Sequence, residues 1–193
     1  MKYYAVKTEE ESKIFTSWED CKNYITGKKG FLHKSFLSLE EANAFLRNQS
    51  IEIDDKIPTA YIDGSFDSAS EAYSFGCVFL HHGIKEEYAR RFDKDKFSAA
   101  RNVAGEIKGA GFIIQHACRI GIKELNICYD YEGIEKWYTG KWKANSEIAL
   151  AYVAFKEEVK NKIKIHFHKI KSHSNNLYND KADQLAKKAL GLL

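Results

Sequence analysis

The spacing of apolar and polar residues changes along the chain and predicts two folded units. In residues 1–48, K-Y-Y-A-V-K-T and S-K-I-F-T-S alternate as strands do, and F-L-H-K-S-F is typical of a third strand. The patterns S-W-E-D at residues 17–20 and S-L-E-E at residues 38–41 are capping boxes, which indicate helix starts. The first unit is therefore predicted to be a small α+β domain with the element order β-β-α-β-α.

Residues 49–58, Q-S-I-E-I-D-D-K-I-P, are predicted to be a linker because they are acidic and end in the only proline of the chain. A second unit at residues 59–193 then alternates strand and helix patterns. Strands are predicted at 59–66, 74–82, 85–92, 124–130 and 164–170, and helices at 102–120, 133–139, 146–161 and 179–191. Three successive strands followed by helix-linked strands predict an α/β fold with a mixed five-stranded sheet and flanking helices.

Four acidic residues interrupt patterns that otherwise build a core. Asp63 lies within an apolar strand, and Glu106 falls on the apolar stripe of the helix predicted at 102–120. Asp130 ends a strand, and Asp183 lies on the core-facing stripe of the last helix. Any one of them is equally well explained by a buried ion pair or a helix cap. Four that converge require hard cations such as Mg²⁺ or Mn²⁺, and two such ions form a clamp that hydrolyses phosphodiesters.

These acids belong to four motifs. They are D-G-S from Asp63, R-N-V-A-G-E ending at Glu106, I-C-Y-D ending at Asp130, and K-S-H-S-N-N-L-Y-N-D-K-A-D ending at Asp183. Over about residues 59–192 the chain resembles type 1 ribonuclease H. The resemblance implies a ribonuclease H-like fold and an endonuclease that hydrolyses the RNA strand of RNA/DNA hybrids, leaving 5′-phosphate and 3′-hydroxyl ends. It also assigns the four carboxylates two Mg²⁺ ions, with Mn²⁺ as a substitute.

Two further residues match the same family. His173 corresponds to its mobile-loop histidine, thought to assist product release or proton transfer, and the near-neutral pKa of histidine suits that role. Asn102 corresponds to a residue that reads the RNA minor groove, where the 2′-OH distinguishes RNA from DNA. Each has a plain alternative, since His173 is one of seven histidines and Asn102 could cap the helix that follows it.

In the first unit, Y-Y-A-V, S-W-E-D-C and K-S-F occur in an order similar to the hybrid-binding domain attached to many type 1 enzymes. That resemblance implies that Tyr4 and Lys34 contact phosphate and that Trp18 packs on DNA sugars. His33 stands where the domain usually has Phe or Tyr, and it is predicted to join this surface. An aromatic platform beside lysines binds a nucleic-acid backbone without reading bases. The alternative for Trp18 is a core anchor at a helix start.

Composition and charge give further expectations about the partner, the cysteines and the cellular location. The net charge is only +3, but lysines outnumber acids between residues 136 and 171, which suits a polyanionic partner or a solvated helix face. Cys21, Cys77, Cys118 and Cys128 lack metal or disulfide spacing and are predicted to be reduced core residues. Because no apolar leader or membrane span is seen, a monomeric cytoplasmic protein is expected.

Two rival interpretations fit part of the pattern. A non-catalytic protein that binds RNA/DNA hybrids or double-stranded RNA would not need four acids. An integrase-like nuclease usually replaces the last acid by a helical Glu at a different spacing. The full acidic set therefore favours the ribonuclease.

Overall fold

The computed structural model describes residues 2–8, 11–28, 30–47, 56–170 and 176–193. They form two compact units, one mainly from residues 1–51 and the other mainly from residues 52–172 and 178–193. Within the described residues, no helix combines the length and the apolar character that crossing a membrane requires.

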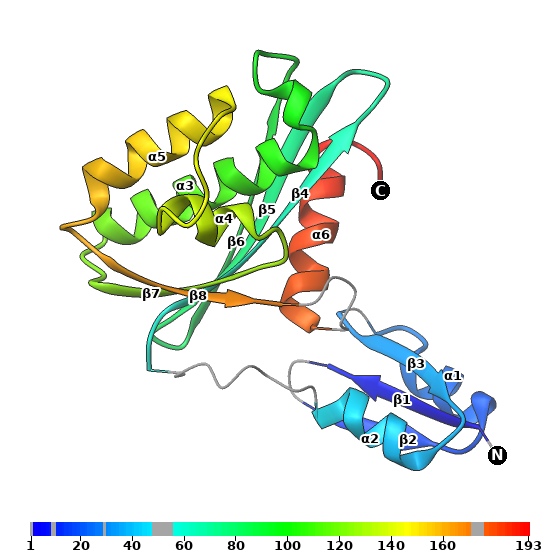
Figure 1. The fold of residues 1–193 in the computed structure, drawn as a ribbon. Helices are drawn as coiled ribbons and strands as arrows, with labels where there is room; N and C mark the ends of the chain where they lie inside the picture. Colours follow the sequence, from blue (N-terminus) through cyan, green and yellow to red (C-terminus); the bar gives the residue numbers. More distant parts are fainter. Residues whose placement is uncertain (1, 9–10, 29, 48–55, 171–175) are drawn as a thin grey trace. The chain divides into compact units, whose positions relative to one another are not determined.

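The first unit is a three-stranded antiparallel sheet with two helices, as Figure 1 shows. Strand β1 (Tyr3–Lys7) lies between β2 (Ser12–Phe15) and β3 (Leu32–Phe36). Helix α1 (Trp18–Ile25) follows β2, and helix α2 (Leu39–Arg47) follows β3. The predicted β-β-α-β-α domain is therefore confirmed.

Both of these helices start where the capping boxes predict. Ser17 Oγ accepts a hydrogen bond of 3.2 Å from the backbone N–H of Glu19, and Ser38 Oγ accepts one of 3.1 Å from the backbone N–H of Glu41. Each bond satisfies a helix-start donor that has no partner within the helix. The small core beside α2 contains the buried residues Ala5, Ala42 and Phe45.

The second unit is a mixed five-stranded sheet in the order β6-β5-β4-β7-β8. Its strands are β4 (Thr59–Asp67), β5 (Ala72–His81), β6 (Ile84–Phe92), β7 (Glu124–Tyr129) and β8 (Lys164–Lys169). Its helices are η1 (Ser98–Ala100, a 3₁₀ turn), α3 (Asn102–Arg119), α4 (Gly133–Tyr138), α5 (Glu147–Val159) and α6 (Leu177–Ala189). Strands β4, β5 and β6 pair antiparallel, whereas β7 is parallel to both β4 and β8. The predicted ribonuclease H-like sheet with flanking helices is confirmed.

The last helix begins earlier than predicted. The apolar pattern indicated a start at residue 179, whereas α6 begins at Leu177. The physical reason is a tertiary contact, because the Tyr178 ring packs against Tyr61 of β4 with 5.2 Å between the ring centroids. A contact with a strand more than 100 residues away leaves no signal in the periodicity of the helix itself.

Helices cover both faces of this sheet. Figure 1 shows α3, α4 and α5 on one face and α6 on the other. The main core lies between the sheet and α3, and its buried side chains include Ile62, Phe75, Phe79, Ile113 and Ile127. On the opposite face, a Cβ atom at Gly76 of β5 would lie 2.7 Å from the backbone nitrogen of Ala186, so α6 packs directly on the strand backbone.

Two glycines let α3 approach the sheet more closely than a side chain would permit. A Cβ atom at Gly64 of β4 would lie 2.7 Å from the backbone nitrogen of Glu106. A Cβ atom at Gly105 of α3 would lie 2.9 Å from the carbonyl carbon of Ser74, and closer still to its oxygen. Any other residue at either position would push α3 away from β4 and β5.

Replacement of Gly105 tests this packing. Gly105→Ala is expected to lower Tm by about 2–12 °C, because overpacking costs about 1–3 kcal/mol and each kcal/mol corresponds to about 2–4 °C at this chain length. Gly111→Ala on the same helix is the matched control, since its Cβ would have only Phe155 nearby, at 3.9 Å. Thermal unfolding followed by circular dichroism measures both, and an unchanged Tm for Gly105→Ala would contradict the close packing.

Candidate active site

The strand register brings two of the predicted acids together. The parallel ladder between β4 and β7 ends at the pair Tyr61 and Cys128, and Asp63 and Asp130 each lie two residues further along. Asp63 Oδ1 accepts a hydrogen bond of 2.7 Å from the backbone N–H of Gly64. Both carboxylates therefore lie at the carboxyl end of a parallel strand pair, where open α/β sheets place their ligands.

Helix α3 adds a third carboxylate to this edge. Glu106 is only 1% exposed, and the close approach of α3 directs it toward the two aspartates. One carboxylate oxygen from each of Asp63, Glu106 and Asp130 lies within 4.8 Å of the other two. The Glu106 carboxylate also accepts a hydrogen bond from the backbone N–H of Tyr131, the residue after Asp130. The structure thus brings together three of the four predicted acids as one group.

Burial and repulsion favour the protonated forms of two of these acids. Burial first of all, and then the charge of Asp130, a hydrogen bond with Asp130 and the charge of Asp63, together raise the pKa of Glu106 to about 10. Burial also raises the pKa of Asp63 to about 7, with the charges of Asp130 and Asp183 adding to the rise and Lys187 opposing it. The cluster is therefore unfavourable as three carboxylates unless positive charge is bound.

The fourth predicted acid comes from α6 on the other face of the sheet. Asp183 stands outside the 4.8 Å group, but its negative charge contributes to the raised pKa of Asp63. Asp183 Oδ2 accepts a hydrogen bond of 2.7 Å from Lys187 Nζ, one helical turn further along. Lys187 was not among the residues predicted for the site, although the i,i+4 spacing of Asp and Lys is a signal for such a pair.

The donor atoms of this cluster fit hard divalent cations. All three grouped ligands are carboxylate oxygens, the donors that Mg²⁺ and Mn²⁺ prefer. Glu106 Oε2 is buried and has no hydrogen-bond partner within the part of the chain that the structure describes. A dication bound among these oxygens would offset the repulsion that raises their pKa values. Asp63, Glu106 and Asp130 could hold such an ion, and Asp183 lies just outside this group.

Two other predicted residues are placed differently. Asn102 is exposed and is the first residue of α3. The N-cap position belongs to Arg101, which has a φ of 55° and makes no side-chain capping bond, so the capping alternative for Asn102 is wrong. Asn102 lies four residues before Glu106 and therefore about one turn away on a similar side of α3. His173 lies outside the described residues.

An aromatic group lies on the first unit beside the start of α1. Trp18 is 44% exposed, and its ring stacks on His33 at a centroid distance of 5.8 Å and tilts against Tyr4 at 5.5 Å. Trp18 is thus a surface residue, and the core-anchor alternative is wrong. Lys34 is not part of this group, because it pairs in register with Ala5, whose side chain faces the α2 core.

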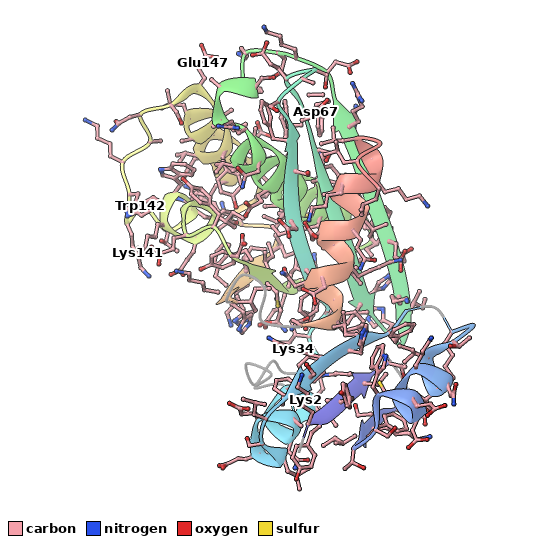
Figure 2. All side chains as sticks on the ribbon, turned by 90° about the vertical axis from the view of Figure 1, so that its right-hand side faces the viewer. Lys2, Lys34, Asp67, Lys141, Trp142 and Glu147 are labelled. Carbon is pink, nitrogen blue, oxygen red and sulfur yellow. The ribbon has the colours of Figure 1, made fainter. Side chains whose placement is uncertain are left out.

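A second aromatic and basic surface follows β7 in the second unit. Figure 2 shows Lys141 and Trp142 on the segment between α4 and α5, at the periphery of the unit. The Trp142 ring lies 6.0 Å from that of Trp137, and Lys136 Nζ lies 4.8 Å from the Trp142 centroid. A shallow pocket of about 450 Å³ is lined by Trp137, Lys141, Trp142, Lys143, Asn145 and Ser146. This surface suits a nucleic-acid backbone.

The four cysteines are all free. Cys21, Cys77 and Cys128 are buried, as predicted. Cys118, near the end of α3, packs against the main core but is only partly buried. The reason is helical geometry: Ala117 occupies the buried stripe of α3, and the next residue is rotated by about 100° toward the side of the helix.

The mixed sheet and its acidic edge define an α/β protein with a carboxylate site of the metal-binding type. Comparison with known families then gives two matches. Residues 2–46 match the model described as the ribonuclease H1 N-terminal domain, and residues 55–191 match the model described as RNase H. Because the second match covers well over half of the residues, the chain belongs to the ribonuclease H family.

Individual relatives are similar over shorter stretches. The chain is 41% identical over 44 residues to a ribonuclease H of Saccharomyces cerevisiae, a match that covers 23% of this chain and 13% of that protein. It is 32% identical over 60 residues to a ribonuclease H of Chlorobium phaeobacteroides, covering 30% of this chain and 41% of that protein. The chain thus spans less than half the length of these relatives.

Solved structures show the same fold at low identity. Ribonuclease H1 from the halophilic archaeon Halobacterium salinarum aligns with a TM-score of 0.58 and 20% identity, over 69% of this chain and 97% of that chain. LC11-RNase H1, solved in complex with an RNA/DNA hybrid, aligns with a TM-score of 0.55 and 16% identity, over 69% and 99% of the two chains.

The raised pKa of Glu106 predicts that Glu106→Gln stabilises the metal-free protein. Between the ordinary value of 4.5 and about 10, the unfolded chain releases a proton that the folded chain retains, so wild-type stability falls as pH rises through this interval. Glutamine does not titrate. At pH 8 the variant is expected to exceed the wild-type Tm by about 2–4 °C or more, and near pH 4 the difference should vanish.

Glu124→Gln is the matched control for that measurement. Glu124 is exposed, and its bonds with His166 and Lys164 lower its pKa, so its removal should bring no gain in Tm at pH 8. A titration with Mg²⁺ gives a second readout, because binding to the folded state raises Tm by mass action and should do so less in Glu106→Gln. Parallel Tm curves for the wild type and Glu106→Gln from pH 4 to 9 would overturn the electrostatic account.

Proposed function

We propose that this chain is a metal-dependent endoribonuclease that hydrolyses the RNA strand of RNA/DNA hybrids. One observation carries the proposal: oxygens of Asp63, Glu106 and Asp130 lie within 4.8 Å of one another in a segment that matches the RNase H family. A protein that only bound nucleic acid would gain nothing from a buried, self-repelling acidic group beside an anionic ligand. The cluster is therefore better explained by metal-assisted phosphodiester hydrolysis.

In the proposed mechanism Asp63 would be the central metal-holding residue, because the charges of both Asp130 and Asp183 act on its carboxylate. Glu106 and Asp130 complete the ligand set on the α3 side, and Asp183 extends it on the α6 side. Two bound Mg²⁺ ions, or Mn²⁺ in their place, would supply an activated water and stabilise charge on the leaving 3′ oxygen, giving 5′-phosphate and 3′-hydroxyl ends. Asp63 and Glu106 would release their protons as the ions bind.

Other groups of the chain would orient the substrate and the ligands. Lys187 holds the Asp183 carboxylate by its ion pair and adds a positive charge at the edge of the cluster. Asn102, which is exposed about one turn before Glu106, would contact the RNA minor groove and its 2′-OH. For His173, assistance to product release or proton transfer stays a prediction. A monomeric state and a cytoplasmic location also stay predictions.

The first unit would hold the hybrid, in keeping with its match to the ribonuclease H1 N-terminal domain. Its exposed Trp18, with His33 and Tyr4 beside it, forms a platform that suits stacking on sugars or bases. Lys34 would contribute from the opposite face of the sheet, as a phosphate contact whose energy is screened by salt. Binding would thus rest mainly on the aromatic group.

Asp130→Asn tests the chemistry. It is expected to lower hybrid cleavage by about 100-fold or more, because a lost ligand removes several kcal/mol of charge stabilisation. Hybrid binding in gel shifts without metal should remain equal or become tighter, since one negative charge is removed from the site. Asp67→Asn is the control: Asp67 lies at the end of β4, where Figure 2 labels it, and its carboxylate accepts hydrogen bonds from Ala69 and Ser70 in the turn that follows.

Full activity of Asp130→Asn would place the chemistry elsewhere. An inactive wild type that still shifted the hybrid would instead support the non-catalytic binding protein. End analysis of the RNA products decides the cleavage chemistry, since the proposal requires a 5′-phosphate and a 3′-hydroxyl.

Trp18→Ala tests the contribution of the first unit to binding of RNA/DNA hybrids. We expect about 5- to 100-fold weaker binding of hybrids at about 0.15 M salt, because stacking contributes about 1–3 kcal/mol per contact. Leu39→Ala is the matched control, since Leu39 is exposed to a similar degree on α2, beside the opposite face of the small sheet. Circular dichroism should show both variants folded, and equal affinity of Trp18→Ala and wild type would contradict the role of the platform.

A further inference from the structure

A second charged pocket lies at the opposite edge of the five-stranded sheet, beside the amino ends of β7 and β8. It holds about 380 Å³, and its lining includes Lys123, Tyr138, Lys160, Asn161, Lys162 and Lys164. Strand β7 spans the residues between this edge and Asp130, so at about 3.3 Å per residue the pocket lies about 20 Å from the acidic cluster. It is separate from the candidate active site.

Two of the four lysines in this pocket have no acidic partner among the residues that the structure describes. Lys160 and Lys164 are each paired with a glutamate, Lys160 at the end of α5 and Lys164 across to β7. Lys123 and Lys162, in contrast, form no ion pair with any residue that the structure describes. The backbone N–H of Lys164 donates a hydrogen bond of 2.8 Å to the carbonyl oxygen of Lys123, which joins the two segments. Two uncompensated ammonium groups therefore line one recess.

Lys123 and Lys162 both line this pocket, one just before β7 and the other shortly before β8. Burial raises the pKa of the Cys118 thiol, and the positive charges of Lys162 and Lys123 oppose that rise. Like charges brought together without a counter-ion repel one another. An anion bound between Lys123 and Lys162 would relieve that repulsion.

The pocket also contains a polar group without a partner. Tyr138 is only 9% exposed and lines the pocket, and its hydroxyl has no hydrogen-bond partner within the described part of the chain. A buried hydroxyl without a partner is unfavourable, and an acceptor oxygen on a ligand would satisfy it. Tyr138 lies beside the same thiol, whose charge contributes to the raised pKa of its hydroxyl after burial. Tyr138 and the two lysines thus belong to the lining of one pocket.

We propose that this pocket binds a small molecule with two linked phosphate groups, such as pyrophosphate or a nucleoside diphosphate. Its oxygens would bridge Lys123 and Lys162 and accept a hydrogen bond from the Tyr138 hydroxyl. The volume lies in the range of small-ligand sites, and the recessed hydroxyl is suited to a compact anion. A duplex, which presents phosphates along an extended ridge, would contact the rim lysines but not the floor. The site is independent of the proposed nuclease function.

Cys118 provides a local readout for the test. The full chain, in buffer without divalent metal, is treated with iodoacetamide, and alkylation of each cysteine is followed by peptide mass spectrometry with increasing pyrophosphate. Cys118 should be protected in a saturable manner, while Cys21, Cys77 and Cys128 are buried and serve as internal references. Each variant is compared with its own rate without ligand, because the lysines themselves influence the thiol.

Three variants decide the assignment. Lys123→Gln with Lys162→Gln should weaken the apparent affinity for pyrophosphate by about tenfold or more, and Tyr138→Phe by about threefold or more. Lys188→Gln, which removes one exposed charge on α6, should leave affinity unchanged. Inorganic phosphate should protect more weakly than pyrophosphate.

The proposal is overturned if pyrophosphate gives no protection, or if the double lysine variant is protected as well as wild type. Equal protection by inorganic phosphate would contradict the two-phosphate ligand. Protection by a short DNA duplex but not by pyrophosphate would make the patch a nucleic-acid surface. None of these results affects hybrid cleavage, which the Asp130 variant tests.

Discussion

Repulsion between buried carboxylates is the constraint on which the second unit depends. Asp63, Glu106 and Asp130 are held within 4.8 Å of one another, where burial and mutual charge raise the pKa of Glu106 to about 10 and that of Asp63 to about 7. A protein selected only for stability would place apolar residues at such a position. The acids stay close together because the packing of the surrounding fold holds them in place. A divalent cation bound among them would make the arrangement favourable.

Close contacts between the backbones of helices and strands hold the acids in place. Gly64 and Gly105 let α3 lie directly against β4 and β5, and Gly76 lets α6 do the same from the other face. The sheet is therefore packed between two helices, and each carries one of the acids: Glu106 on α3 and Asp183 on α6. Because these contacts involve backbone atoms, small shifts of the helices are resisted, and the acids cannot separate to relieve their repulsion.

Charge and aromatic surface are divided between different parts of the chain. The acidic edge of the sheet would perform the chemistry, while the exposed Trp18 group and the segment around Trp142 would provide contacts to a polyanion. Separation of these tasks has a physical advantage, because a strongly basic surface placed directly on the acidic cluster would compete with metal ions for its carboxylates. Lys187 is the exception, and its ion pair with Asp183 confines its charge to one edge.

The sequence by itself determined the order and type of the elements and the identity of the acids. Periodicities of two and 3.6 residues are local, so they predicted each strand and α-helix named here but not the short 3₁₀ turn η1. Asp63 and Glu106 were detectable because a charge on an apolar face conflicts with the local pattern. Only the tertiary structure decided which residues far apart in the sequence lie in contact. The register of β4 and β7 set Asp63 beside Asp130, and the packing of α6 on the sheet brought Tyr178 to Tyr61.

The same distinction explains the predictions that were wrong and the site that was not foreseen. Whether Trp18 or Cys118 is covered depends on which element packs beside it, and no spacing along the chain records that. Lys123 and Lys162 are 39 residues apart in sequence and share a pocket only because β7 and β8 pair in parallel from Glu124 and Lys164 onward. The identity of each side chain can be read from the sequence. Which distant side chains come to lie together depends on long-range strand pairing.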